Sequence, residues 1–313
     1  MHIIKNNANI LILYNDFTKG KKDNLSNNDD ERIFIFQTLR SMDFRVNAIA
    51  FKNTTDLIFS IQKFQPDLIF NLFKAAEKND PDEMHIVALM ELLNLPYIGH
   101  SPFILGLSNM KNFMKRLLEN KKIPAIEYQI YRDMPKSTYL NFPVSARIAG
   151  AEWLATREMN DVISDFDSLK DKVKILLNKY EKPVIVEKYF VGRIFQAGVF
   201  GNKELSVLPL CELNIKNGNS KLICPTDLDS DISFHIQDTA IHVYKYLMGR
   251  DFATVSFLVD NSNKIYVVDY HPNPSISPGS VIYESLKVAK QKFEDFLYFI
   301  INEALTRKTH VKN

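Results

Sequence analysis

Short apolar runs alternate with amphipathic segments in the N-terminal part of the chain. The runs have the composition of buried parallel strands and lie at 9–14, 44–51 and 66–73. Between them, residues 32–42 and 54–64 carry apolar side chains at helical spacing, and Thr54 or Thr55 is the predicted cap of the second helix. The polar stretch 15–31 is predicted to be a loop. This βαβαβ order predicts a small parallel sheet covered by helices.

The remaining pattern is mixed. Helical spacing is predicted at 83–94, 102–124, 166–180, 231–249 and 285–307. Strands are predicted at 142–150, at 151–159, within 183–213, at 251–260 and at 264–271. Because strands and helices are interspersed throughout, the fold class is α/β with additional α+β lobes.

Bulk properties narrow the function classes. The formal net charge is +2 in 313 residues, which gives no electrostatic case for nucleic acid or an anionic membrane. No apolar run approaches the roughly 20 residues that span a bilayer, and the short N-terminal apolar run is predicted to be a strand rather than a signal peptide. Cys211 and Cys224 do not form a CxxC pair and fit two free thiols in a reducing compartment. We therefore expect a cytoplasmic protein.

The second strand of the terminal pair carries candidate metal ligands. Period two places Asp269 and His271 on one face of this strand, at its exit into the loop "HPNPSISPGS". A carboxylate and an imidazole side by side could hold a divalent cation. The alternative is that His271 is a hydrogen-bonded turn residue.

Several collinear motifs carry a family resemblance. The segments "SNMKNF", "VIVEKYF" and "VVDYHPNPSISPGS" resemble the phosphate, adenine and metal motifs of the ATP-grasp ligases, closest to the D-alanine–D-alanine ligase branch. The resemblance implies an ATP-grasp fold with an N-terminal Rossmann-like lobe and two lobes that clasp a nucleotide. The implied boundaries are 1–95 for the N-terminal lobe, 96–182 for the central lobe and 183–313 for the C-terminal lobe.

The resemblance also implies nucleotide-binding residues. Lys111 matches a phosphate-contacting lysine, and Arg147 stands where the family has a second one. Glu187 and Lys188 match residues at the adenine edge, and Phe190 follows in the same motif. The alternatives are a solvated helix lysine at position 111 and ordinary strand ion pairs at positions 147 and 187.

The implied substrate side lies elsewhere in the chain. Glu31 resembles the glutamate that holds the amine of the first substrate, and Ser280 matches a serine near the carboxylate of the second. Together with Arg147, these two residues are the candidate catalytic groups. Glu83 falls in a segment matching the substrate loop and is expected to be solvated. The alternative for Glu31 is a charge pair at a helix start.

Other positions depart from the family pattern. Trp153 lies where a glycine-rich loop should approach phosphate, and Ile194 replaces a ribose-binding glutamate. Ser256 replaces a metal-binding aspartate, Thr254 replaces an arginine, and His271 replaces a metal-binding asparagine. Two functional hypotheses follow.

The first hypothesis is an ATP-dependent carboxylate–amine ligase that acts on amino acids or a peptide through an acyl-phosphate, with altered nucleotide and metal handling. Its cofactors would be ATP and magnesium or manganese. The second is a catalytically inactive relative that acts as a binding or regulatory subunit. The expected assembly is a homodimer or a complex with an active homologue, without nucleic acid or membrane partners. A standard cell-wall ligase is disfavoured by the substituted positions.

Overall fold

The computed structural model describes residues 8–15, 25–74, 82–149, 153, 162–216 and 219–307. Its N-terminal sheet is parallel, has the order β2-β1-β3, and consists of β1 (Asn9–Asn15), β2 (Arg45–Phe51) and β3 (Leu68–Asn71). The helices that follow these strands are α1 (Leu25–Ser41), α2 (Thr54–Phe64) and α3 (Asp82–Leu92). The predicted βαβαβ unit is thus present.

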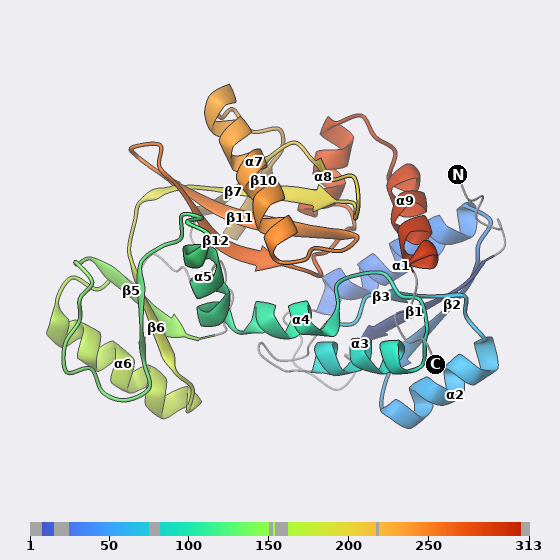
Figure 1. The fold of residues 1–313 in the computed structure, drawn as a ribbon, viewed down its shortest axis with the longest axis horizontal. Coiled ribbons are helices and arrows are strands. Elements are labelled where there is room, and N and C mark those ends of the chain that lie inside the picture. Colours follow the sequence, from blue (N-terminus) through green and yellow to red (C-terminus); the bar gives the residue numbers. More distant parts are fainter. Residues whose placement is uncertain are drawn as a thin grey trace.

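Both faces of this sheet are covered (Figure 1). Leu11 and Leu13 of β1 pack against α2 and α3. Ile10 and Ile12 face the opposite way and pack with α1 and with the last two helices of the chain, α8 (Val281–Val288) and α9 (Phe293–Thr306). The end of the chain therefore completes a core that begins at its first strand.

A second sheet of three antiparallel strands forms a separate lobe at the lower left of Figure 1. It has the order β4-β6-β5 and consists of β4 (Tyr128–Tyr131), β5 (Val144–Ile148) and β6 (Val184–Lys188). Helix α6 (Phe166–Tyr180) covers one face and contributes Leu169 and Val173 to the core, and Asp165 caps it by accepting from Ser168 N–H at 2.8 Å. The other face is turned away from this core.

The third sheet is the largest and has the order β10-β9-β7-β11-β12, with β8 paired to β7. Its strands are β7 (Gly192–Phe200), β8 (Ser206–Val207), β9 (Cys211–Lys216), β10 (Asn219–Ile223), β11 (Phe252–Asp260) and β12 (Ile265–His271). One face packs against α7 (Ser230–Tyr246) and against α4 (Pro102–Asn109) and α5 (Lys111–Asn120). The opposite face carries polar side chains.

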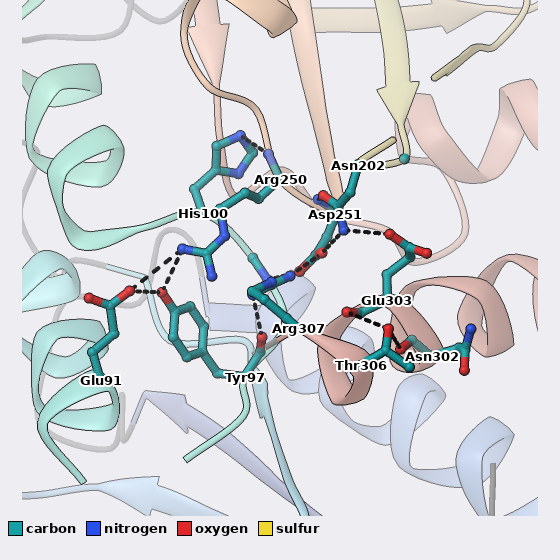
Figure 2. Close-up of polar contacts among 12 residues, drawn as sticks. Glu91, Tyr97, His100, Asn202, Arg250, Asp251, Asn302, Glu303, Thr306 and Arg307 are labelled. Atoms are coloured by element: carbon teal, nitrogen blue, oxygen red, sulfur yellow. Dashed lines mark hydrogen bonds and ion pairs between the residues drawn. The ribbon is translucent and has the colours of Figure 1, made fainter. Parts of the chain in front are cut away.

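Asp251 joins three distant segments of the chain (Figure 2). Its carboxylate accepts from Gly99 N–H at 2.7 Å and from the Asn202 side chain at 3.0 Å, and it forms an ion pair with Arg307. Its backbone lies in the left-handed region, at φ 61°, which aspartate tolerates better than most residues. Asp251 is fully buried, so these bonds satisfy its charge.

His100 lies beside this joint and is also buried. Its Nε2 atom lies 2.6 Å from the Tyr270 hydroxyl, and burial lowers the pKa of His100 to about 3. A neutral imidazole therefore accepts from the tyrosine at neutral pH. Arg250 follows in the same region and donates to the Tyr97 hydroxyl at 3.2 Å (Figure 2).

Three local expectations need correction. Helix α1 begins at Leu25, inside the stretch predicted as a loop. Helix α2 is capped by Asn53, whose side chain accepts from Asp56 N–H at 2.9 Å, rather than by Thr54 or Thr55. Two helices predicted as continuous are each divided: the one at 102–124 is α4 and α5, which meet at Met110, and the one at 285–307 is the end of α8 followed by α9.

The strand predicted at 151–159 lies outside the described residues except for Trp153, which is in a turn. Within the described ranges, no helix has the length and apolar character needed to cross a membrane.

Candidate nucleotide and substrate site

A β-bulge positions the residues at the end of β12. Phe257 of β11 pairs with Val267, but its neighbour Ser256 pairs with Asp269, so β12 contains one extra residue at this point. Without the bulge, Asp269 would share the α7-facing side of the sheet with Val267, because side chains alternate. With it, Asp269 faces the opposite, polar side.

Asp269 forms the central ion pair of this face. The Lys111 ammonium, at the start of α5, lies 2.6 Å from Asp269 Oδ1, and both side chains are buried. The backbone N–H of Trp153 points to Oδ2 at 3.4 Å. Burial alone would raise the pKa of Asp269, but Lys111 and His271 hold it well below its usual range. This carboxylate is therefore ionised at every physiological pH.

A second buried cluster lies on the polar face of the three-stranded sheet. Register places Arg147 opposite Ile185 and Ser145 opposite Glu187, so Arg147 and Glu187 are diagonal neighbours on one face. Arg147 Nε lies 3.1 Å from Glu187 Oε2, and Lys115 Nζ lies 2.5 Å from Glu187 Oε1. Burial would raise the pKa of Glu187, but Arg147 and Lys115 lower it to about 2.

The two clusters share an electrostatic environment. Arg147 also lowers the pKa of Asp269, and Lys111 and Lys115 are one helical turn apart on α5. Among the described residues, the two clusters contain three cationic groups and two carboxylates. Three buried cations close together favour an anionic ligand.

An apolar cluster adjoins these charges. The Trp153 side chain is 7% exposed and belongs to a cluster whose other buried members are Ile126, Ile194, Leu258, Tyr266 and Val268. Phe190 packs at its edge, with its ring stacked on that of Tyr266 at a centroid distance of 4.9 Å. The Lys188 ammonium lies 5.1 Å from the Phe190 ring centroid. These residues form an aromatic and aliphatic surface beside the buried cations.

His271 has a hydrogen-bonded position. Its Nε2 atom lies 3.4 Å from the Ser256 hydroxyl and 3.7 Å from Asp269 Oδ2. Ser256 in turn accepts from the Gln196 side chain at 3.0 Å. His271 is therefore part of a polar chain that runs across β12, β11 and β7.

The described residues do not form a resident magnesium site. They contain no group of three or more His, Cys, Asp or Glu side chains that could hold a metal ion. Both Asp269 oxygens face donors, Oδ1 the Lys111 ammonium and Oδ2 the Trp153 N–H. Magnesium prefers six oxygen ligands, and Asp269 with His271 supplies one carboxylate. We therefore derive no chemical step through a protein-held metal.

Glu31 lies in a different constellation, between the N-terminal lobe and the loop after β12. Its carboxylate accepts from the Ser275 hydroxyl at 2.8 Å and from Ile276 N–H at 2.7 Å. The Lys74 ammonium completes the site at 3.2 Å from Oε2. Glu31 is 3% exposed, so its carboxylate is enclosed by the protein. The Lys74 ammonium already occupies the position of a cationic partner.

Ser280 and Glu83 border this region. The Ser280 side chain caps α8 by accepting from Tyr283 N–H at 3.3 Å. Glu83 is half-buried and accepts from Asn273 Nδ2 at 2.6 Å, which corrects the expectation that it is solvated. Burial raises the pKa of Glu83 to about 7, against smaller opposing effects of Asn273 and Lys74.

Two lysines of these sites, the buried Lys115 and the partly exposed Lys74, were not singled out from the sequence. Lys115 carries a signal, because it lies four residues after Lys111 and so shares its helix face. Lys74 carries no comparable signal, since its partner Glu31 is distant in the chain. Lys111, Arg147, Glu187, Asp269 and His271 lie together, whereas Glu31 and Ser280 lie nearer the N-terminal sheet.

Known proteins resemble this chain over much of its length. Residues 161–302 match the family model described as D-ala D-ala ligase C-terminus. The chain is 24% identical over 279 residues to the uncharacterized protein y4sG of Sinorhizobium fredii, covering 80% of this chain and 81% of that protein. It is also 24% identical over 272 residues to a D-alanine–D-alanine ligase of Moorella thermoacetica, covering 80% and 86%.

Solved structures share the whole fold. A D-alanine–D-alanine ligase from Bacillus anthracis complexed with ATP superposes with a TM-score of 0.78 at 17% identity, covering 95% of this chain and 97% of that one. The VanG D-Ala:D-Ser ligase from Enterococcus faecalis gives a TM-score of 0.78 at 17% identity, with 95% and 99% covered. At these identities the likeness establishes the fold.

Proposed function

We propose that this chain, an ATP-grasp protein of the D-alanine–D-alanine ligase-like branch, is an ATP-dependent carboxylate–amine ligase with altered nucleotide handling. The observation that carries the proposal is that three buried cations, Lys111, Lys115 and Arg147, lie close together. We place the nucleotide phosphates beside these cations. The proposed lobes are 1–95, 96–182 and 183–313.

The base of the nucleotide is assigned to the apolar cluster. Phe190 and Tyr266 offer a stacked aromatic pair there, and Lys188 lies at its edge. The Trp153 side chain packs in the same cluster, so a base would have to take its place. Competition between the indole and a nucleobase would weaken nucleotide binding relative to a preformed pocket.

A divalent ion enters this proposal as part of the nucleotide substrate. Mg²⁺ or Mn²⁺ would reach the site on the ATP phosphates, whose oxygens supply most of its ligands. Asp269 and His271 would then add one carboxylate and one imidazole, a donor pair that suits manganese better than magnesium.

The substrates are proposed to be amino acids or a small peptide. One substrate carboxylate would attack the γ-phosphate to give an acyl-phosphate, and an amine would then displace phosphate. Arg147 would stabilise the charge on the transferred group, since a guanidinium can bind phosphate through two N–H groups. Glu31 would bind the amine of the first substrate, which would replace the Lys74 ammonium as its partner. Ser280 would lie near the carboxylate of the second substrate.

A second candidate function rests on a separate observation. Lys111, Arg147, Glu187 and Asp269 all have internal ion-pair partners, and Trp153 is buried between the lobes. A chain whose cleft is satisfied without ligand could serve as a non-catalytic subunit of an active homologue. Such a subunit would keep the fold without turnover.

Thermal unfolding together with phosphate release distinguishes a ligase from a non-catalytic subunit. ATP with Mn²⁺ at 100 times its dissociation constant should add about 2.7 kcal/mol to the unfolding free energy and raise the melting midpoint. Phosphate release in a screen of amino acids should then identify substrates. Lys111→Met should abolish the ATP shift, while Lys174→Met, at an exposed position of α6, should leave it unchanged. Absence of any shift at millimolar ATP would remove the ligase proposal.

A further inference from the structure

The two cysteines of the chain occupy facing positions on neighbouring strands. Cys211 begins β9, and Cys224 directly follows β10. The antiparallel register pairs Ile223 with Glu212, so the next position pairs Cys224 with Cys211. Directly opposed residues of an antiparallel pair have Cα atoms about 4.5–5.5 Å apart. That separation falls inside the range of about 4.4–6.8 Å that disulfide bonds require.

Both thiols converge on one hydroxyl. Cys211 Sγ lies 3.2 Å and Cys224 Sγ lies 3.8 Å from Ser285 Oγ, on α8. Ser285 donates its proton to the carbonyl of Pro209 at 2.7 Å, which leaves its oxygen to accept from the thiols. Side-chain direction therefore agrees with the backbone register.

The two sulfurs differ in accessibility and acidity. Cys224 is partly exposed, and its hydrogen bond with Cys211 lowers the pKa of its thiol. Cys211 is fully buried, and the same hydrogen bond, followed by burial, raises its pKa. Thiolate is the reactive form, so Cys224 is the thiol that meets an external reagent first.

We propose that Cys211 and Cys224 are a reversible dithiol–disulfide site, which closes by exchange with a low-molecular-weight disulfide. The Cys224 thiolate attacks one sulfur of the reagent, breaks its S–S bond and releases one thiolate. Cys211 then loses its proton to solvent and attacks the Cys224 sulfur, which releases the second thiolate. The two cysteines are oxidised by two electrons, and the reagent is reduced to two thiols.

The site goes beyond the proposed ligase activity. The bond would join the edge strand β10 to β9 on the face of the sheet that also carries Leu213 and Ile215. Both of these residues pack against the cluster that contains Trp153. Oxidation would therefore fix the hairpin that borders the proposed nucleotide cleft.

The test uses the full-length folded protein and oxidised glutathione, without nucleotide. Wild type should lose both free thiols, carry no glutathione adduct, and lose the mass of two hydrogen atoms. Peptide mapping without reductant should link Cys211 to Cys224, and dithiothreitol should restore both thiols. A stable glutathione adduct on the wild-type chain, a disulfide between two chains, or two unreacted thiols would each overturn the proposal.

Single variants test the order of attack. Cys211→Ser should trap glutathione on Cys224, because the resolving thiol is gone. Cys224→Ser should leave Cys211 unmodified in the folded protein, since that thiol is buried. Equal modification of the two variants would contradict the assigned roles. These readouts do not involve ATP, so their failure is distinguishable from failure of the ligase proposal.

Discussion

The Lys111 ammonium lies 2.6 Å from the Asp269 carboxylate, and this buried ion pair joins helix α5 to the end of strand β12. The two residues were expected to contact a nucleotide phosphate and a metal ion. In the structure the two side chains neutralise each other's charge. Ligand binding by either residue therefore has to compete with an existing contact, and this relationship defines the first prediction.

Removing one member of the Lys111–Asp269 ion pair should destabilise the folded protein. Asp269→Asn leaves the Lys111 ammonium buried without a counter-charge, and the unfolding free energy should fall by about 3–5 kcal/mol. The double variant Lys111→Met/Asp269→Leu should recover much of this loss, because no isolated charge remains. Urea denaturation of Lys111→Met, of Asp269→Leu and of the double variant measures the coupling. Strictly additive losses would show that the two residues do not interact.

Ionised Glu187 should stabilise the folded protein, and this stabilisation should be lost in acid. Its pKa falls from 4.5 in the unfolded chain to about 2 in the folded protein, so its stabilisation is present above pH 4.5 and is lost as pH falls toward 2. Glu187→Gln should flatten unfolding free energy against pH in that window. The exposed Glu119→Gln serves as the control. Unchanged slopes in both variants would refute the assignment.

Glu83 should make the folded protein less stable as the pH rises toward neutrality. Its pKa rises from 4.5 to about 7 on folding, chiefly because of burial, so stability should decrease as pH rises through this interval. Glu83→Gln keeps the neutral form at all pH values and should remove that decrease. Melting midpoints measured from pH 4.5 to pH 8 test this. A wild-type profile that rises toward pH 8 at the same rate as the variant would contradict it.

Ser256 is suited to a gain-of-function test. It lies opposite Asp269 in the register and 3.4 Å from the His271 Nε2 atom. Ser256→Asp would add a second carboxylate, and Mn²⁺ should then raise the melting midpoint more than it does in wild type. Ser256→Asn, similar in shape but uncharged, is the matched control. Equal Mn²⁺ shifts in the two variants would mean that the three side chains do not converge on an ion.

Trp153 is the only tryptophan of the chain and reports directly on the apolar cluster. The free protein should emit at short wavelength because the indole is buried. ATP with Mn²⁺ should shift the emission to longer wavelength if the base displaces the indole. Tripolyphosphate, which lacks a base, should not. A rise in melting midpoint without any change of emission would place the nucleotide elsewhere.

Part of this architecture was predictable from the sequence. The apolar runs identified the parallel N-terminal sheet, and the terminal β-pair with Asp269 and His271 on one face is present. The bulge that makes this possible left no recognisable mark on the sequence, because the extra residue, Val268, is identical to Val267 before it. Strand alternation alone accounts for Asp269 and His271 sharing a face but not for which face they share.

The burial of charged side chains was harder to predict from the sequence. A lysine or glutamate on an amphipathic helix is usually solvated, so the local sequence did not identify the distant partners of Lys115 and Glu83. Their contacts with Glu187 and Asn273 arise only when segments far apart in the chain pack together. Local sequence also misplaced helix boundaries, because Asn53 competes with two adjacent threonines as a cap.

The joint at Asp251 has a consequence for biosynthesis. Asp251 binds Arg307, and the core beneath β1 includes side chains from α9, so both depend on residues translated long after β1. While the ribosome still holds α9, the N-terminal strands lack part of their packing surface. The N-terminal core should therefore close only once α9 has been released from the ribosome, and nascent chains stalled before α9 should remain sensitive to protease throughout their N-terminal region.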